Sequence, residues 1–225
     1  MNSGQSEWES RVVISTLIDI LNTINRGDFK SETIKELERQ EASLTRLQQT
    51  PAVDHTLLNS ILNNLRGLTE HLYAIKGQIG SDVRQDELLK SIIQRSSIPG
   101  GSCDFEIPAY PFWLQQPTSI RQAQLSQWLE SLEIVQLSVG FLLKLLRESS
   151  TPKIESAIAG NFQKKLAADN TCQLIRVFLP RELPCYAEIN GGKHRFTIRL
   201  MEPLLNARPK QTEQDIQFKL SCCTL

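Results

Sequence analysis

The chain has 225 residues, with 25 Lys and Arg against 25 Asp and Glu and 40% hydrophobic residues. This length supports one large or two modest cores, and the composition argues against disorder. Zero formal net charge argues against a nucleic-acid-coating protein or a polybasic membrane anchor, because both need a one-sided field. No stretch approaches the roughly 18 apolar residues of a membrane span, and the start lacks the order of a signal peptide, so we expect a cytosolic protein.

Charge and periodicity both change along the chain. Residues 1–150 carry 14 Lys and Arg against 18 Asp and Glu, whereas residues 151–225 carry 11 against 7. The first part shows helical periodicity, and the second alternates with a period near two. We therefore predict an α+β fold, with a helical bundle domain over residues 1–150, a small antiparallel β-sheet domain over 151–225, and a boundary near Ser149–Pro152.

The first half of the helical part predicts three helices. Apolar residues recur at spacings of three and four from Glu7 to Asn25. A second helix should run from about Thr33, capped in a box with Glu36, to Gln49. Asp54 should cap a third helix, whose long apolar seam is Leu58, Ile61, Leu65, Leu68, Leu72, Ile75 and Ile79.

The second half predicts a short helix over about Arg84–Ser96 and a long one from Thr118 to Glu148. The seam of the long helix comprises Leu125, Trp128, Leu132, Val135, Val139, Leu142 and Leu146. The seams can form the core of one bundle or be shared with a second subunit, and both can hold for different faces.

Residues between these helices allow a short strand and an aromatic cluster. Alternation over residues 103–107 suggests a strand that joins the later sheet. Tyr110, Phe112 and Trp113 then form an aromatic group, either as part of the core or as a platform for a ligand.

The β part predicts five strands, over Ile154–Leu166, Cys172–Leu179, Cys185–Ile189, His194–Glu202 and Gln214–Cys222. In the fourth strand, apolar residues face one side while Arg195 and Arg199 face the other. Lys193 and His194 precede that strand, and Lys219 occupies a similar outward position in the fifth. This basic face is either a solvated sheet surface or an anion-binding surface.

Signals for catalysis, metals and cofactors are weak. The five cysteines are odd in number and widely spread, as expected of reduced thiols, and Cys222 and Cys223 should face opposite sides of a strand. No CxxC, HxxxH or HExxH motif is present, and the Gly pairs lack the spacing of a phosphate loop. A nucleophilic pair would need Cys103 or Cys185 brought to His194 by the fold. We therefore predict no catalytic residue, no metal and no cofactor.

Five strings in register nevertheless resemble a known family. They are RGDFKSETIKELERQ at 26–40, SIPGGSCDF at 97–105, QWLESL at 127–132, KHRFTIR at 193–199 and FKLSCC at 218–223. Together they are similar to the ZapD family of bacterial cell division proteins. The resemblance implies a homodimer of helical and β domains that binds the C-terminal tail of FtsZ and bundles its filaments at midcell, without being an enzyme.

The resemblance also implies site residues. Arg195 and Arg199 match basic positions of the family's tail-binding pocket, and Lys193, His194 and, on the fifth strand, Lys219 are further candidates for binding the partner. A family arginine aligns with Glu87, for which Arg84 or Lys90 are neighbouring substitutes, and a family histidine aligns with Pro111. A family helix that precedes Glu7 is absent here, which suggests a misassigned start codon or a missing piece of the helical core.

Two other classes of function remain. A nucleic-acid-binding module could use the same basic face, although Phe196 and Phe218 lie in the apolar register and leave that face without the aromatic residues that stack on bases. A thiol hydrolase would depend on Cys103 or Cys185.

Overall fold

The computed structural model describes residues 6–98, 105–166, 172–192 and 194–224. The chain divides into two compact units, Met1–Gly140 and Phe141–Leu225. The division falls within helix α8 (Glu133–Glu148), and the boundary that we expected near Ser149–Pro152 lies just after this helix ends. Helices precede antiparallel strands, so the predicted α+β class is confirmed.

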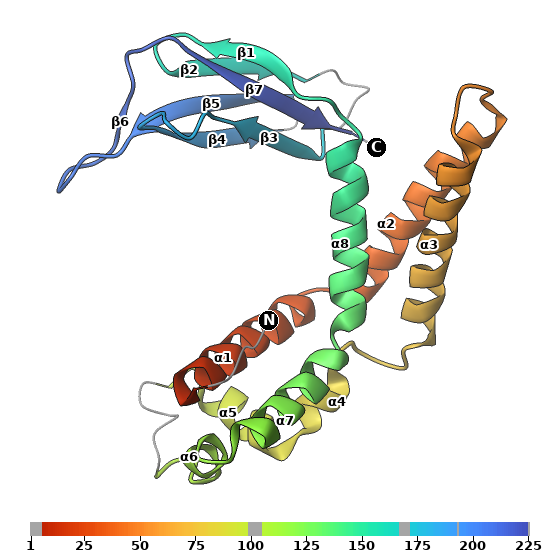
Figure 1. Cartoon of the computed structure of the whole chain (residues 1–225), viewed down its shortest axis with the longest axis vertical. Coiled ribbons are helices and arrows are strands. Elements are labelled where there is room, and N and C mark those ends of the chain that lie inside the picture. Colours follow the sequence, from red (N-terminus) through yellow and green to blue (C-terminus); the bar gives the residue numbers. More distant parts are fainter. Residues whose placement is uncertain (1–5, 99–104, 167–171, 193, 225) are drawn as a thin grey trace. The chain divides into compact units, whose positions relative to one another are not determined.

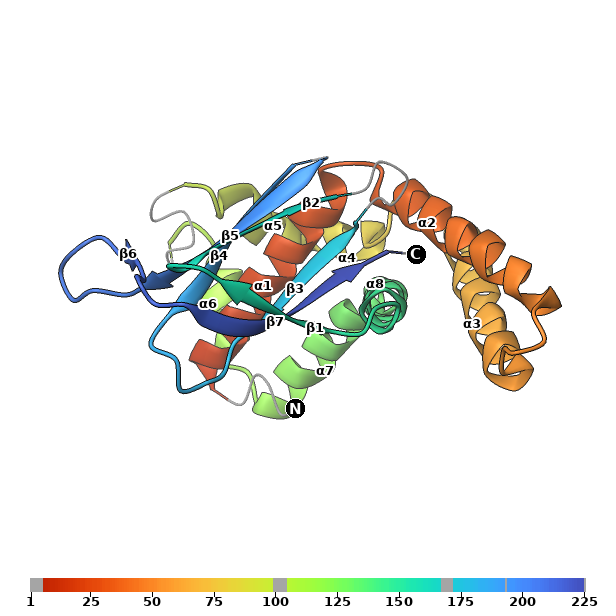
Figure 2. The ribbon, with the colours of Figure 1, turned by 90° about the horizontal axis from the view of Figure 1, so that it is seen from above.

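The first unit is helical (Figure 1). In addition to the start of α8, it contains α1 (Glu7–Asn25), α2 (Phe29–Thr45), the 3-10 helix η1 (Arg46–Gln49), α3 (His55–Ala74), α4 (Ser81–Gln85), α5 (Glu87–Arg95), α6 (Ala109–Leu114) and α7 (Thr118–Glu130). α2 and α3 pack side by side as a hairpin, which both Figure 1 and Figure 2 show.

Helix α1 has the predicted bounds because its start is doubly capped. The Ser6 hydroxyl accepts a hydrogen bond from the Glu9 amide at 3.1 Å, and the Glu9 carboxylate accepts one from the Ser6 amide at 3.2 Å. This capping box satisfies two of the amides that a helix start leaves unpaired. Ile14, Leu17 and Leu21 then face the core with almost no exposed surface.

Two other predicted helices differ from the structure at one end. The second begins at Phe29 rather than Thr33, because the Asp28 carboxylate accepts a hydrogen bond from the Ser31 amide at 3.2 Å. Hydrogen bonds from the Ser31 hydroxyl and the Ser31 amide lower the pKa of Asp28. The third ends at Ala74, and Ile79 is buried in the loop that follows.

Two predicted helices are each divided. Asp86 has extended backbone angles between α4 and α5, and its carboxylate accepts from the amides of Leu88 and Leu89 at 3.0 Å. The long helix breaks at Ser131, whose hydroxyl donates to the Asp82 carboxylate at 2.6 Å, so α7 and α8 are separate. Across Ser131 the apolar spacing continues from Trp128 to Leu132 and Val135, which is why the sequence pattern did not reveal that break.

The aromatic group predicted after the short strand lies mostly in the core of this unit. Tyr110 and Trp113 are buried with ring centroids 6.5 Å apart, Trp113 packs on Trp128 at 5.8 Å, and Phe112 is exposed. The strand itself is not formed over residues 105–107, where the chain turns into α6, and residues 103 and 104 lie outside the described part. Core packing is therefore the role of Tyr110 and Trp113.

The second unit is a sandwich of two antiparallel sheets rather than the one sheet expected. The first sheet has the order β1–β7–β3, and the second has the order β2–β5–β4 with β6 paired to β5. The strands are β1 (Lys153–Ala157), β2 (Asn161–Lys165), β3 (Leu174–Phe178), β4 (Tyr186–Gly192), β5 (Arg195–Glu202), β6 (Lys210–Gln211) and β7 (Ile216–Cys223).

The predicted strand Ile154–Leu166 is two strands, which belong to different sheets. The alternation of apolar and polar residues did not reveal the turn between them, which has Ala159 at φ 44° and Gly160 at φ 68°. Two successive positive φ values are the geometry of a tight two-residue hairpin turn. The amide of Ile158 donates to the carbonyl of Asn161, and the amide of Asn161 donates to the carbonyl of Ile158, each at 2.9 Å.

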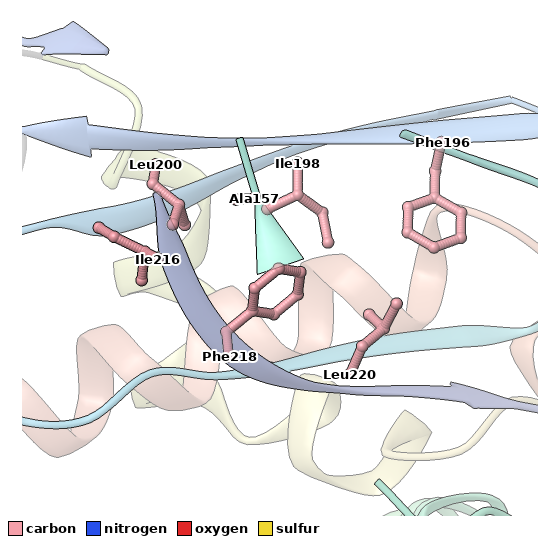
Figure 3. Packing of buried hydrophobic residues seen from close by; sticks show 7 residues of the cluster. All are labelled: Ala157, Phe196, Ile198, Leu200, Ile216, Phe218 and Leu220. Atoms are coloured by element: carbon pink, nitrogen blue, oxygen red, sulfur yellow. The ribbon is translucent and has the colours of Figure 1, made fainter. Parts of the chain in front are cut away.

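The two sheets meet through a compact apolar core (Figure 3). Alternate residues of the central strands β5 and β7 supply most of it, together with Ala157, and the fully or nearly buried members are Ala157, Phe196, Ile198, Leu200, Ile216, Phe218 and Leu220. At one side an ion pair joins Lys164 of β2 to Glu155 of β1 at 3.0 Å. Because inward positions are filled this way, the intervening residues of each central strand must face outward.

Candidate partner-binding surface

The outer face of the sheet β2–β5–β4 contains the arginines predicted from alternation. Phe196, Ile198 and Leu200 point into the sandwich, so Arg195 and Arg199 project to the opposite side. Both arginines are exposed. The fold thus brings these two predicted residues to one surface.

The strand register adds a third cation that the sequence did not reveal. Lys165 of β2 lies directly opposite Arg195 of β5. Like charges at directly opposed positions destabilise an antiparallel pair. Within the described ranges, neither side chain forms an ion pair with a carboxylate. The exposed residue His194 precedes Arg195, and its carbonyl accepts a hydrogen bond from the Leu166 amide at 2.8 Å.

Arg199 has a different environment from Arg195. It faces Glu188 of β4 across the strand pair, and its Nη2 donates to the Glu188 Oε2 at 2.8 Å. Both side chains remain about half exposed. The charge of Arg199 is therefore partly balanced within the chain, while a peptide carboxylate can still reach its guanidinium.

An aromatic side chain also occupies this face. Tyr186 of β4 pairs with Met201 of β5, and the register places it on the same side as Glu188 and Arg199. Its exposed fraction is 40%. The face therefore offers a ring two positions along β4 from Glu188, the partner of Arg199. The sequence did not reveal this proximity, because Tyr186 and Arg199 lie on different strands.

Lys219 lies on the other side of the sandwich. It alternates with the core residues Phe218 and Leu220 of β7, so it projects from the outer face of β1–β7–β3. The structure does not bring it together with Arg195 and Arg199. Lys193 lies outside the described residues.

The two predicted cations of the first unit have unlike environments. Arg84 of α4 donates through Nη2 to the Leu21 carbonyl, and its Nε is buried without a hydrogen-bond partner among the described residues. Lys90 of α5 is exposed and lies 3.5 Å from the Glu87 carboxylate. Arg84 therefore links α4 to α1 by a hydrogen bond, and Lys90 belongs to a solvent-exposed ion pair.

The first unit also contains a groove that the sequence did not predict. It has a volume of about 400 Å³ and lies among α1, α5 and α6, with Ile14, Ile18 and Ile92 on its lining. At one end the Arg11 guanidinium carbon lies 4.8 Å from the centroid of the Tyr110 ring. Arg11 and Tyr110 are far apart in the sequence, and no local motif links them.

Among the described residues, the thiols whose pKa is shifted favour the neutral form. Cys185 packs against the sandwich core, and this burial raises its pKa and so favours the neutral thiol. The described cysteines, Cys172, Cys185, Cys222 and Cys223, are free, and Cys103 lies outside the described residues. Across the described ranges, no group of three or more His, Cys, Asp or Glu side chains is placed to hold a metal ion.

None of the helices in the described part of the chain combines the length and the apolar character needed to cross a bilayer.

Comparison with known proteins supports the resemblance seen in the sequence. A family model described as ZapD, cell division protein, matches residues 1–199. Cell division protein ZapD of Methylococcus capsulatus is 40% identical over 224 residues, covering 100% of this chain and 88% of the relative. The ZapD proteins of Nitrosomonas europaea and Coxiella burnetii are 33% and 36% identical, over 100% and 96% of this chain and 85% and 84% of their own lengths. The chain belongs to the ZapD family of cell division proteins.

Proposed function

We propose that the chain is a non-enzymatic cell division factor of the cytoplasm that binds the C-terminal tail of FtsZ and, as a homodimer, cross-links FtsZ filaments at midcell. Membership of the ZapD family supports a role in division. The choice of a tail peptide as ligand rests on the chemistry of the face that carries Arg195.

The observation that carries the proposal is the opposition of Lys165 and Arg195. The two cations repel each other across adjacent strands, and within the described residues no carboxylate is paired with either. A peptide carboxylate bound between them would replace this repulsion with two charge-assisted hydrogen bonds. The half-exposed Tyr186 ring, further along the same face, offers contact area for an apolar side chain of the peptide.

Bundling then follows from valency rather than from a strong single site. Exposed ion pairs contribute only about 0–1 kcal/mol each, so one face holds one tail weakly. A twofold dimer presents the same face twice, and a filament presents many tails. The second contact is made at a high effective concentration, which converts weak contacts into a stable cross-link.

The proposal is tested by reversing the charges of the face. Arg195→Glu combined with Arg199→Glu should reduce co-sedimentation with FtsZ polymers to the level seen with FtsZ that lacks its tail. The mass of the dimer, measured by light scattering after gel filtration, should be unchanged. Both positions are exposed strand residues, so the core of the sandwich is retained.

A matched control makes the same change in net charge elsewhere. Lys35→Glu with Arg39→Glu reverses two exposed cations of α2 at the same spacing along the chain. This control should co-sediment like the unaltered protein. If both double variants lose FtsZ equally, binding depends on net charge alone and the proposed face is wrong.

Nucleic acid is the competing ligand for the same face. Sheets that stack bases combine several exposed rings with cations that no carboxylate balances. Here Glu188 balances Arg199, and Tyr186 supplies one ring, so the face is less suited to nucleic acid. A gel shift with random single-stranded oligonucleotides at modest salt distinguishes the two ligands. Binding comparable to that of FtsZ would overturn the proposal.

A further inference from the structure

The outer face of the sheet β1–β7–β3 carries a groove on the opposite side of the sandwich from Arg195. Its volume is about 490 Å³, which is within the usual range of ligand sites. The lining residues come from all three strands and the segment after β3, and they are Ile154, Phe178, Leu179, Pro180, Gln217, Phe218 and Lys219. The groove therefore lies across the sheet and is a property of the assembled β unit.

Lys219 occupies the middle of an apolar row on this face. The register places Ile154 of β1 on one side of it and Phe178 of β3 on the other. Ile154 has 69% of its surface exposed, which is unusual for an isoleucine in a sheet. A cation between two accessible apolar side chains can bind a ligand that combines a carboxylate with apolar groups.

A second cation strengthens the positive character of the face. The Arg176 guanidinium carbon lies 4.7 Å from the centroid of the Phe178 ring, and Nη1 donates to the Arg147 carbonyl at 3.0 Å. The guanidinium is thus held in place by a ring and a neutral oxygen, neither of which cancels its charge.

Acidic side chains are missing from the paired outward positions of this sheet. These positions hold Ile154, Ser156, Leu174, Arg176, Phe178, Gln217, Lys219, Ser221 and Cys223. Glu155 points to the other side, where it pairs with Lys164. Among the described residues neither Lys219 nor Arg176 forms an ion pair with a carboxylate, so the face is complementary in charge to an acidic ligand.

From this arrangement we infer that the groove around Lys219 is a second binding site, which takes an extended peptide of alternating apolar and acidic residues. In an extended peptide successive side chains point to opposite sides, so one set can fill the space beside Ile154 and Phe178. Carboxylates of the other set, at the rim, reach Lys219 and Arg176. This site does not depend on the proposed FtsZ-binding face.

Fluorescence anisotropy with two synthetic peptides tests the inference. The probe is a fluorescein-labelled peptide of alternating leucine and glutamate, and its matched control alternates leucine and lysine. The measurements use the protein with both Arg195→Glu and Arg199→Glu, so that the other basic face does not contribute. We expect saturable binding of the leucine–glutamate peptide and none of the control.

Variants of the groove then locate the binding. Lys219→Glu should raise the dissociation constant at least about tenfold, because repulsion replaces attraction. Ile154→Ser, at an exposed position, should weaken binding without affecting folding. Lys210→Glu, on β6 of the other sheet, makes the same charge change and should bind like its parent.

Four results would overturn the inference. The first three are an absence of binding, equal binding of the leucine–lysine peptide, and equal binding by the Lys219→Glu protein. A fourth is a concentration-dependent loss of dimer mass in Ile154→Ser, which would assign the groove to contact between two copies of the chain.

Discussion

Single side chains decide whether a predicted cation is available to a partner. Arg195 and Arg84 look alike in the sequence, since each stands between one apolar and one polar neighbour. In the structure Arg195 is exposed opposite Lys165, whereas Arg84 donates to the carbonyl of Leu21 inside the helical unit. The sequence could not separate these roles, because the partner of Arg84 lies on another helix.

The role of Arg84 leads to a stability prediction. Arg84→Ala removes a hydrogen bond to a part-buried carbonyl, and we expect a loss of about 1–3 kcal/mol in the free energy of unfolding of the helical unit. Lys90→Ala, which removes only an exposed pair, should change it by no more than about 0.5 kcal/mol. Urea denaturation followed by circular dichroism compares the two. Unchanged stability of Arg84→Ala, together with weaker FtsZ co-sedimentation, would instead make Arg84 a contact residue.

At the scale of elements, capping and alternation were predictive where they were local. Asp54 caps α3 as predicted, the bounds of α1 follow from its apolar face, and β5 follows from the regular exchange of inward and outward residues. Which strands face one another was not predictable. Arg199 and Lys219 occupy outward positions in the same alternating pattern, but they belong to different sheets. This becomes visible only from the strands with which β5 and β7 each pair.

The turn between β1 and β2 gives a prediction at this scale. Gly160 has φ +68°, and a Cβ added there would lie 2.6 Å from the Thr212 backbone oxygen. Gly160→Ala should therefore cost at least about 1–3 kcal/mol, seen as a lower melting temperature of the β unit. Gly27→Ala is the control, since nothing lies within 4 Å of its added Cβ. Equal melting of the two variants would contradict this account of the turn.

For the whole molecule, the proposed cross-linking combines weak charged contacts with a dimer that presents two of them. Raising the ionic strength to about 1 M shortens the Debye length to about 3 Å and should abolish bundling, measured by light scattering of FtsZ polymers. The dimer mass at the same salt should persist. Polymers of FtsZ alone provide the control for effects of salt on assembly. Bundling that survives high salt would show that apolar contacts dominate.

The position of β7 in the chain has a consequence for synthesis. β1 and β3 both pair with β7 and not with each other, although both precede it in the sequence. While the ribosome is still making residues 179–215, these two strands have no hydrogen-bonding neighbour in their own layer. Domains generally fold as units during translation. The Lys219 groove therefore comes into existence only when residues 216–223 have emerged, so a nascent chain cannot capture a ligand there before its sandwich is closed.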